Sequence, residues 1–278
     1  MKKILLAILI LYSNLSLIAQ DLKIMTYNIR LDVASDHKNS WSNRKEFFCS
    51  QLNFYEPDIF GIQEALPNQV IDISLALPKY TNVGIGRDGI GKGESSTIYF
   101  KKDRFETLQE NTFWLSETPK KVSKGWDAAY NRICTYVLLK DKISNKTFWV
   151  FNTHLDHLGN IAKNKSITLI LSKIKQLNTN EFPVFLIGDF NSDSTDDHML
   201  KLKLEMNDSY EISGQKPFGS IGTFNGFHHN RKPKQRLDYI FLSKNNFFKI
   251  KKYAVLTDSK DLRYPSDHFP VYIETIIE

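Results

Sequence analysis

The feature that most constrains the fold is an apolar run that ends abruptly in polar residues, FPVFLIGDFNSD at 182–193. Its residues 184–187 lie between Pro183 and Gly188, which is typical of a fully buried strand. Asp189 follows at once, and burying an unpaired carboxylate beside such a strand costs several kcal/mol. Asp189 therefore needs a cation, a proton or an opening to solvent. An ordinary Asp/Asn turn is the alternative interpretation of the same residues.

The same arrangement recurs at other predicted strand ends, and this recurrence favours a functional site over a turn. In layered α/β folds, strand ends that face a cleft are where catalytic groups usually lie. Strands are expected at 22–28, 58–63, 95–101, 107–115, 133–139, 147–152, 184–187, 237–242 and 270–276, and helices at 41–55, 67–77, 160–177 and 196–204. The polar residues at or near the strand ends are Asn28, Glu64, His154, Asp189, Asn191, Asp238, Asp267 and His268.

The sequence predicts one domain built from two packed sheets. No Pro/Ser-rich linker, change of composition, internal repeat or low-complexity tract divides residues 21–278. The glycine-rich segment 80–94 is expected to be a long loop, because its spacing matches neither a dinucleotide-binding turn nor a P-loop. Many strands with few helices between them indicate an α+β fold, in which helices flank two mixed, mostly antiparallel sheets.

The first twenty residues differ in kind from the rest. Lys2 and Lys3 precede an apolar run at 4–11, and Ala19 is a small residue suited to cleavage. This order is typical of a secretory signal peptide, and the run is too short for a membrane span. No cysteine directly follows the run to carry a lipid. We therefore expect a monomer without a stable membrane anchor that is exported, to the periplasm or outside the cell.

The composition excludes a disordered chain, and the net charge indicates what kind of substrate the protein could bind. Hydrophobic residues at 41% and charged residues at 24% exclude a disordered chain. Residues 1–20 hold two lysines and no acidic residue, so their removal lowers the formal net charge from +6 to +4. This excess suits an anionic substrate without requiring nucleic acid. Cys49 and Cys134 lie far apart in sequence, and we expect two buried free thiols.

The polar strand-end residues predict a site for a hard cation. Oxygen donors such as Glu64, Asn28 and Asp267 suit Mg²⁺ or Mn²⁺, whereas zinc sites show histidine or cysteine at short spacings. The sequence has no G-x-S-x-G elbow, which argues against acyl transfer through a serine. Hydrolysis of a phosphate ester needs a cation, histidines near the phosphoryl oxygens and a carboxylate for the attacking water. The residues therefore indicate that chemistry.

Seven short motifs follow one another along the chain: TYN at 26–28, QE at 63–64, GES…IYF at 93–100, NTHLD at 152–156, GDFN at 188–191, RLDYIF at 236–241 and SDHFPV at 266–271. In this order they resemble the endonuclease/exonuclease/phosphatase superfamily, which has the deoxyribonuclease I-like fold. The layout looks most like secreted bacterial members related to the deadenylase branch. The resemblance implies a four-layer αββα sandwich and metal-dependent hydrolysis of phosphate esters.

The resemblance also implies roles at the metal and at the water. Glu64 would be the main Mg²⁺ or Mn²⁺ ligand, with Asn28 beside it and Asp267 on the opposite wall. Asp189 would orient or deprotonate the attacking water. Asn191 would hold a phosphate oxygen.

Two histidines are expected at the phosphoryl group. His268 would act there, with its tautomer fixed by Asp238. His154 would make a second phosphate contact, with Glu94 as its carboxylate partner, since such a pair in a partly dry cleft favours the imidazolium form. The residues expected to bind substrate are Glu94, Arg132 and Asn225.

Three functions stay open at this point. A phosphodiesterase, in particular a nuclease, is favoured by the motifs, while a phosphodiesterase or phosphatase acting on sugar, inositol or lipid-linked phosphates is the alternative. A binding protein that has lost catalysis is the third. The basic cluster of Arg231, Lys232, Lys234 and Arg236 is typical of a solvated loop, but it could also form a phosphate-tracking rim.

Overall fold

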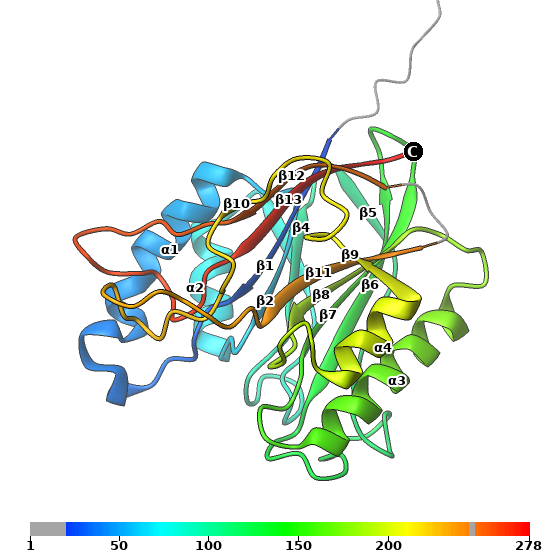
Figure 1. The fold of residues 1–278 in the computed structure, drawn as a ribbon, viewed down its shortest axis with the longest axis horizontal. Coiled ribbons are helices and arrows are strands. Elements are labelled where there is room, and N and C mark those ends of the chain that lie inside the picture. The colour runs from blue at the N-terminus through cyan, green and yellow to red at the C-terminus, as the bar shows by residue number, and fades with distance from the viewer. Residues whose placement is uncertain (1–20, 245–247) are drawn as a thin grey trace, which may run out of the picture.

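In a computed structural model, which describes residues 21–244 and 248–278, two sheets pack face to face between two pairs of helices (Figure 1). The expected signal peptide lies outside the described residues. On one outer side lie α1 (Trp41–Tyr55) and α2 (Pro67–Ala76), and on the other α3 (Asn160–Leu177) and α4 (Asp197–Glu205). A 3₁₀ helix, η1 (Ala34–Asn39), precedes α1. The predicted four-layer αββα sandwich of the α+β class is therefore confirmed.

Both sheets are mixed. The seven-stranded sheet has the order β10 (Phe218–Gly219), β12 (Phe248–Val255), β13 (Val271–Ile277), β1 (Leu22–Asn28), β2 (Ile59–Gln63), β4 (Ile98–Lys101) and β3 (Tyr80–Val83). The six-stranded sheet has the order β5 (Phe105–Trp114), β6 (Ile133–Asp141), β7 (Thr147–His154), β8 (Val184–Asp189), β11 (Asp238–Ser243) and β9 (Met206–Asp208). The pairs β1–β2, β7–β8 and β10–β12 are parallel, and the other described pairs are antiparallel.

Three apolar cores hold the four layers together. The core between the sheets includes Ile24 and Ile187. A second core packs α1 and α2 on the first sheet through residues such as Phe48, and a third packs α3 and α4 on the second sheet through residues such as Ile170 and Leu202. Burial of such side chains contributes roughly 1.5–3 kcal/mol each, so these cores supply the main driving force for folding.

The two-residue period of the strands carries polar side chains to the end of the central core. In β1, Ile24 points between the sheets, so Asn28 at the end of the strand points the same way. In β8, Phe185 and Ile187 enter that core, and Asp189 continues the same face. The same period places Asp238 of β11 and His154 of β7 on this face.

The structure differs from the sequence predictions in four strands. β3 lies in the segment expected to be a loop, and β9, β10 and β12 were not predicted. In β12, a register shift between Ile250 and Lys252 interrupts the two-residue alternation, and Lys249 is exposed. The segment therefore shows no strand period in its sequence.

Cys49 and Cys134 are buried free thiols, as predicted. Burial raises the pKa of Cys49 to about 11, so that thiol stays protonated at neutral pH. Among the described residues, no helix combines the length and apolar character that a membrane crossing requires.

A buried ion pair fixes the start of β11. The Arg236 guanidinium donates two hydrogen bonds to Asp208, at 3.1 and 2.6 Å, and lies 4.4 Å from the centre of the Tyr239 ring. We expect Arg236→Met to lower the free energy of unfolding by about 3–5 kcal/mol, because Asp208 would stay buried without its partner. Urea denaturation measures this. The control is Lys232→Met, which replaces an exposed lysine of the same segment. It should change the free energy of unfolding by less than about 0.5 kcal/mol.

Candidate active site

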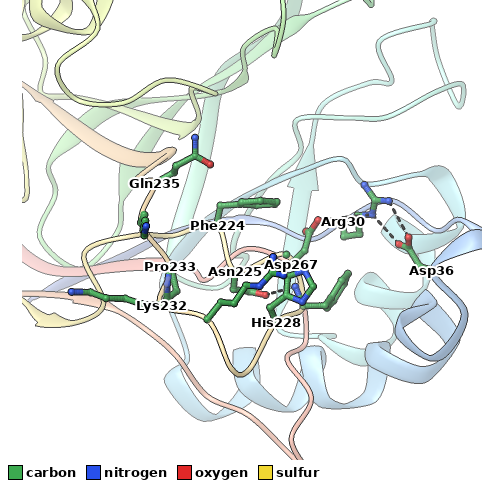
Figure 2. Close-up of a pocket in the computed structure, with 13 residues that line it drawn as sticks. Arg30, Asp36, Phe224, Asn225, His228, Lys232, Pro233, Gln235 and Asp267 are labelled. Atoms are coloured by element: carbon green, nitrogen blue, oxygen red, sulfur yellow. Dashed lines mark hydrogen bonds and ion pairs between the residues drawn. The ribbon is translucent and has the colours of Figure 1, made fainter.

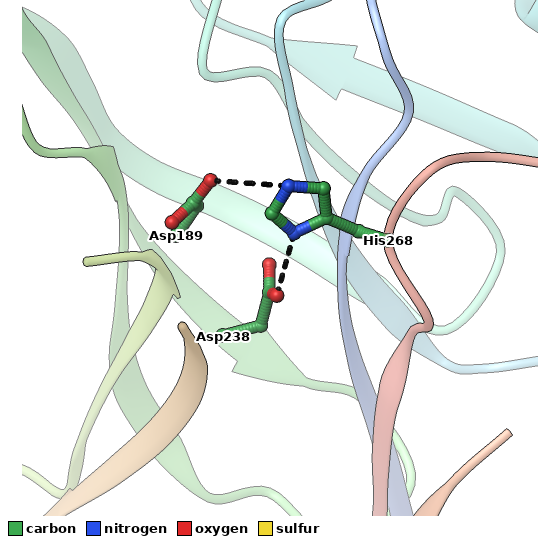
Figure 3. Close-up of side chains that lie close together, drawn as sticks. All are labelled: Asp189, Asp238 and His268. Atoms are coloured by element: carbon green, nitrogen blue, oxygen red, sulfur yellow. Dashed lines mark hydrogen bonds and ion pairs between the residues drawn. The ribbon is translucent and has the colours of Figure 1, made fainter. Parts of the chain in front are cut away.

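Three side chains from separate strand ends meet at one end of the sandwich (Figure 3). His268 Nδ1 lies 2.8 Å from Asp238 Oδ2, and His268 Nε2 lies 3.9 Å from Asp189 Oδ2. Asp189 and Asp238 are directly opposite in the antiparallel pair β8–β11. The expected contact between His268 and Asp238 is therefore present, and it turns Nε2 toward Asp189.

A glycine lets Asp189 reach this position. Gly188 has a φ of 147°, and a Cβ there would overlap the carbonyl oxygen of Thr153 on the neighbouring strand β7. A larger residue would push β8 away from β7. This explains why a glycine precedes Asp189 in the GDFN motif.

The site holds one positive imidazole and one basic carboxylate. Burial opposes protonation of His268, but the charges of Asp238 and then Asp189 outweigh it and raise its pKa well above the ordinary value. Burial and the charge of Asp238 raise the pKa of Asp189, toward the range in which a carboxylate can act as a base near neutral pH. Two groups with such opposed environments are suited to separate acid and base roles.

His154 and Asn191 lie on the other side of Asp189. His154 Nε2 is 3.5 Å from Asp189 Oδ2 and 3.0 Å from Asn191 Nδ2, and Asn191 Nδ2 also donates to the Leu155 carbonyl at 2.9 Å. Both amide hydrogens of Asn191 are thus engaged in the tautomer of His154 that carries its proton on Nδ1. A hydrogen bond from Asn191 to a phosphate oxygen would have to replace one of these bonds.

The expected pairing of His154 with Glu94 is wrong. Glu94 Oε1 forms an ion pair with Arg87 Nη2 at 2.8 Å, and the carboxylate within ion-pair distance of His154 is that of Asp189. Burial, and then the charge of Arg132, lower the pKa of His154 well below its ordinary value. Its ring is therefore neutral near pH 7 and not the imidazolium that the sequence suggested.

Asn28 and Glu64 lie beside Asp189. Asn28 Nδ2 donates to Glu64 Oε1 at 3.0 Å and to Asp189 Oδ2 at 2.8 Å, while the backbone N–H of Leu31 donates to Glu64 Oε2 at 3.1 Å. Asn28 Oδ1 accepts a hydrogen bond from the backbone of Arg30 at 3.1 Å. The role of Asn28 as a metal ligand stays a prediction, and in this structure Asn28 is a hydrogen-bond donor to both carboxylates. Its amide nitrogen, not its oxygen, faces the carboxylates and holds them in place.

Asp267 stands on the opposite wall, where the sequence placed it. Its Oδ2 is 4.0 Å from Nε of Arg30, which itself pairs with Asp36 at 2.8 Å. Burial raises the pKa of Asp267, the charge of His268 lowers it, and the charge of Glu64 raises it again. Negative charge thus accumulates between Glu64 and Asp267. Arg30 and Arg44 offset part of this charge, and two carboxylate oxygen donors on facing sides fit a divalent cation such as Mg²⁺ or Mn²⁺.

Asp189, Asp238 and His268 also bring three possible ligand atoms within 4.8 Å of one another. In this cluster, however, the protonated imidazole already compensates the carboxylates, and its Nδ1 is bonded to Asp238. A cation would have to displace that proton. A hard cation is better matched by the oxygen donors of Glu64 and Asp267.

Arg132 lies in the wall of the cleft, as the sequence predicted. Its Nε is 3.2 Å from Asp156 Oδ1, and its Nη2 is 3.2 Å from His157 Nδ1. The Tyr130 ring stacks on His157 at 5.9 Å, with the guanidinium of Arg87 at 4.7 Å from the ring centre. Cationic and aromatic side chains that contact one another therefore form this wall of the cleft, whose volume is about 640 Å³.

The side chain of Asn225 takes part in a turn, and its contact with substrate stays a prediction. Its Nδ2 donates to the Ser266 carbonyl at 3.1 Å, and its Oδ1 accepts from the backbone of Phe227 at 2.8 Å. The neighbouring Phe224 is 37% exposed, and its ring centre lies 5.1 Å from that of His268. Phe224 is thus the residue of this segment that lines the cleft, while Asn225 shapes the turn.

Three charged or aromatic cleft residues were not identified from the sequence. Arg30 directly follows the TYN motif and has a left-handed backbone with φ of 59°, so its position after the motif was an available signal. Arg87 lies in the glycine-rich segment and Tyr130 in a polar connection between strands. Neither segment has a period from which the direction of a side chain could be predicted.

The comparisons with known proteins agree with this geometry. The sequence model of the Endonuclease/Exonuclease/phosphatase family matches residues 25–268. The mannosyl-6-phosphatase Bt3783 of Bacteroides thetaiotaomicron superposes with a TM-score of 0.86 at 38% identity, over 92% of this chain and 99% of that one. The catalytic domain of human Nocturnin superposes with a TM-score of 0.72 at 19% identity, over 93% and 94% of the two chains. The Nocturnin similarity shows the fold alone.

A similarity to a curated protein is weaker. Uncharacterized protein L388 of Acanthamoeba polyphaga mimivirus is 28% identical over 191 residues, which cover 62% of this chain and 66% of the relative. The chain spans about two thirds or less of the length of the curated relatives that it matches.

Proposed function

Since the chain belongs to the endonuclease/exonuclease/phosphatase family, we propose that it is a divalent-metal-dependent hydrolase whose substrate is a sugar phosphate. Hydrolysis of phosphate esters is the activity of the family. The observation that carries the proposal for this chain is the joint placement of the Asp238–His268–Asp189 cluster and the Glu64–Asp267 pair in one cleft.

The reaction needs a water molecule to attack phosphorus. Asp189 is placed to orient that water and accept its proton, since its carboxylate is buried and its pKa is raised. Asn28 and the backbone N–H of Asn191 fix the Asp189 carboxylate through hydrogen bonds of 2.8 Å each. The water oxygen then bonds to phosphorus, the ester P–O bond breaks, and the leaving oxygen takes up a proton.

The charges in the cleft suit the phosphoryl group. The imidazolium of His268 keeps Nδ1 on Asp238 and offers Nε2 to a phosphoryl oxygen, where it stabilises developing negative charge. In the tautomer that is protonated on Nε2, neutral His154 would offer a second N–H group beside Asp189. A Mg²⁺ or Mn²⁺ ion held by Glu64 and Asp267 would polarise the phosphoryl oxygens.

A sugar phosphate is the favoured substrate because, of the proteins named above, the one most similar to this chain is a sugar phosphatase. The mannosyl-6-phosphatase shares 38% identity over nearly the whole of both chains, whereas the similarity to Nocturnin shows only the fold. The cleft of about 640 Å³ falls in the size range of small-molecule sites. The nuclease that the motifs favoured therefore becomes the second candidate, supported by the basic residues beside the cleft.

We expect the purified protein to release phosphate from mannose 6-phosphate with Mg²⁺ or Mn²⁺, and the rate to fall to background in EDTA. Bis-p-nitrophenyl phosphate, plasmid DNA and poly(A) serve as parallel substrates. Cleavage of the nucleic acids without release of phosphate from the sugar would support the nuclease instead. Full activity in EDTA would contradict the metal dependence, and no hydrolysis of any ester despite bound metal would support a non-catalytic binding protein.

A further inference from the structure

A second pocket adjoins the catalytic cleft (Figure 2). Its volume is about 750 Å³, and most of its lining comes from the segment 224–235, between the Phe224 turn and the start of β11. It shares four residues with the cleft: Arg30, Phe224, Gln235 and Asp267. A molecule that reacts in the cleft can therefore extend into this pocket without crossing another part of the protein.

Three of the basic residues that line the pocket form no ion pair with a described residue, although the lining also includes the carboxylates of Asp36 and Asp267. Arg231, Lys232 and Lys234 line it and are exposed, and within the described residues none of the three has an acidic group in ion-pair distance. Arg30, in contrast, is held by Asp36 at 2.8 Å. Three unpaired cations on one short segment favour an anion on their side of the pocket.

The basic segment is fixed to the active site by backbone contacts. The backbone N–H of Thr223 donates to the Gln235 carbonyl at 2.8 Å, and the Thr223 hydroxyl accepts hydrogen bonds from the N–H groups of Leu237 and Asp238, at 2.9 and 3.2 Å. A side chain at Gly222 would overlap the backbone of Pro233. The segment therefore closes tightly at its base, and its lysines are held next to the strand that carries Asp238.

We propose that this pocket binds a second anionic group, a phosphate or a carboxylate, on the organic part of the substrate. The proposal rests on the proposed function, because the cleft would hold the phosphate that is hydrolysed. Phe224 separates the two sites, with its exposed ring beside His268. An apolar ring between a phosphate site and a basic pocket fits the carbon skeleton of a small doubly charged molecule.

A small anionic molecule fits better than a nucleic-acid backbone. The unpaired cations lie on one segment of a bounded pocket, whereas binding of a polyanion uses a positive groove that follows several successive phosphates. The other side of the catalytic cleft offers Arg87 and Arg132, but both are engaged by acidic partners, Glu94 and Asp156. The excess of positive charge is therefore local.

The test compares mannose 6-phosphate with two substrates that carry a second anionic group, a hexose 1,6-bisphosphate and the open-chain acid 6-phosphogluconate. The variant is Lys232→Gln with Lys234→Gln, and the control is Lys165→Gln with Lys175→Gln, two exposed lysines of α3. We expect the variant to lower kcat/KM about tenfold, through KM, for the two doubly charged substrates. Mannose 6-phosphate should change less than about twofold, and the control variant should match the wild type.

Binding gives a readout that does not depend on turnover. In the Asp189→Asn background with Mg²⁺, calorimetry should show the same selective loss of affinity. A loss for the bisphosphate alone identifies a second phosphate as the ligand, and a loss for both substrates identifies a general anion site. An equal loss for all three substrates, no loss, or a loss confined to an oligonucleotide would overturn the proposal. If no ester is hydrolysed but the binding difference persists, the proposed function fails and the anion pocket stands.

Discussion

Asp189→Asn should lower the turnover of phosphate esters by about 10³-fold or more while the protein stays folded. The asparagine keeps the shape of the side chain, and its one amide oxygen can still accept one of the two hydrogen bonds, from Asn28 or from the backbone of Asn191, that the carboxylate accepts at 2.8 Å each. It loses the negative charge and the basic oxygen, so it cannot accept the proton of the attacking water. Initial rates under saturating substrate and Mg²⁺ measure the effect.

The control for this variant is Asp193→Asn, in the exposed turn that follows the same strand. It removes the same charge four residues away and should retain at least about half of the wild-type rate. Circular dichroism and the urea midpoint check that both variants fold. Near-normal turnover in folded Asp189→Asn would remove Asp189 from the reaction and with it the proposed role of the GDFN motif.

The positions of most polar side chains in the site follow from sequence because they sit at the ends of regular strands. The two-residue period that buries Phe185 and Ile187 between the sheets also directs Asp189 to the end of that core. The same reasoning applies to Asp238, two residues before Ile240. In such cases a pattern of apolar residues fixes the direction of a polar one.

The contacts that the sequence missed lie in segments without a period. Glu94 belongs to a recognised motif, yet its partner Arg87 lies in a glycine-rich loop, and only the path of that loop brings the two to 2.8 Å. The orientation of Asn225 likewise depends on a turn in which its amide donates to the carbonyl of Ser266. Motifs identify which residues reach the site, but local hydrogen bonds decide which atoms face it.

The strand β12 shows the same limit at the level of the fold. Its bulge between Ile250 and Lys252 shifts the register, so buried and exposed positions no longer alternate along the sequence. Pairing with β13 over most of its length stabilises the strand in spite of this. Such pairing is a tertiary interaction, and the intrinsic preferences of lysine-rich residues do not reveal it.

Glu64→Gln should weaken Mn²⁺ binding by at least about tenfold, since even residues that only support a metal ligand contribute roughly 10–100-fold to affinity. The amide keeps one of the two acceptor oxygens to which Asn28 and Leu31 donate at 3.0 and 3.1 Å, and it removes the charge that the cation needs. Turnover should fall by about 100-fold in parallel. Calorimetry of Mn²⁺ binding and initial rates give the two numbers, and Glu46→Gln, at an exposed position of α1, is the matched control.

The variant Asp238→Asn distinguishes between the two candidate metal sites of the cleft. If the cation is held by Glu64 and Asp267, this variant should bind Mn²⁺ within about twofold of the wild type, because within the described residues the hydrogen bond of the Asp238 carboxylate goes to Nδ1 of His268 and not to Glu64 or Asp267. Its turnover should nevertheless drop by about 100-fold or more, since His268 loses the group that fixes its tautomer and favours its charge. Loss of Mn²⁺ binding in Asp238→Asn together with retention in Glu64→Gln would instead place the metal among Asp189, Asp238 and His268.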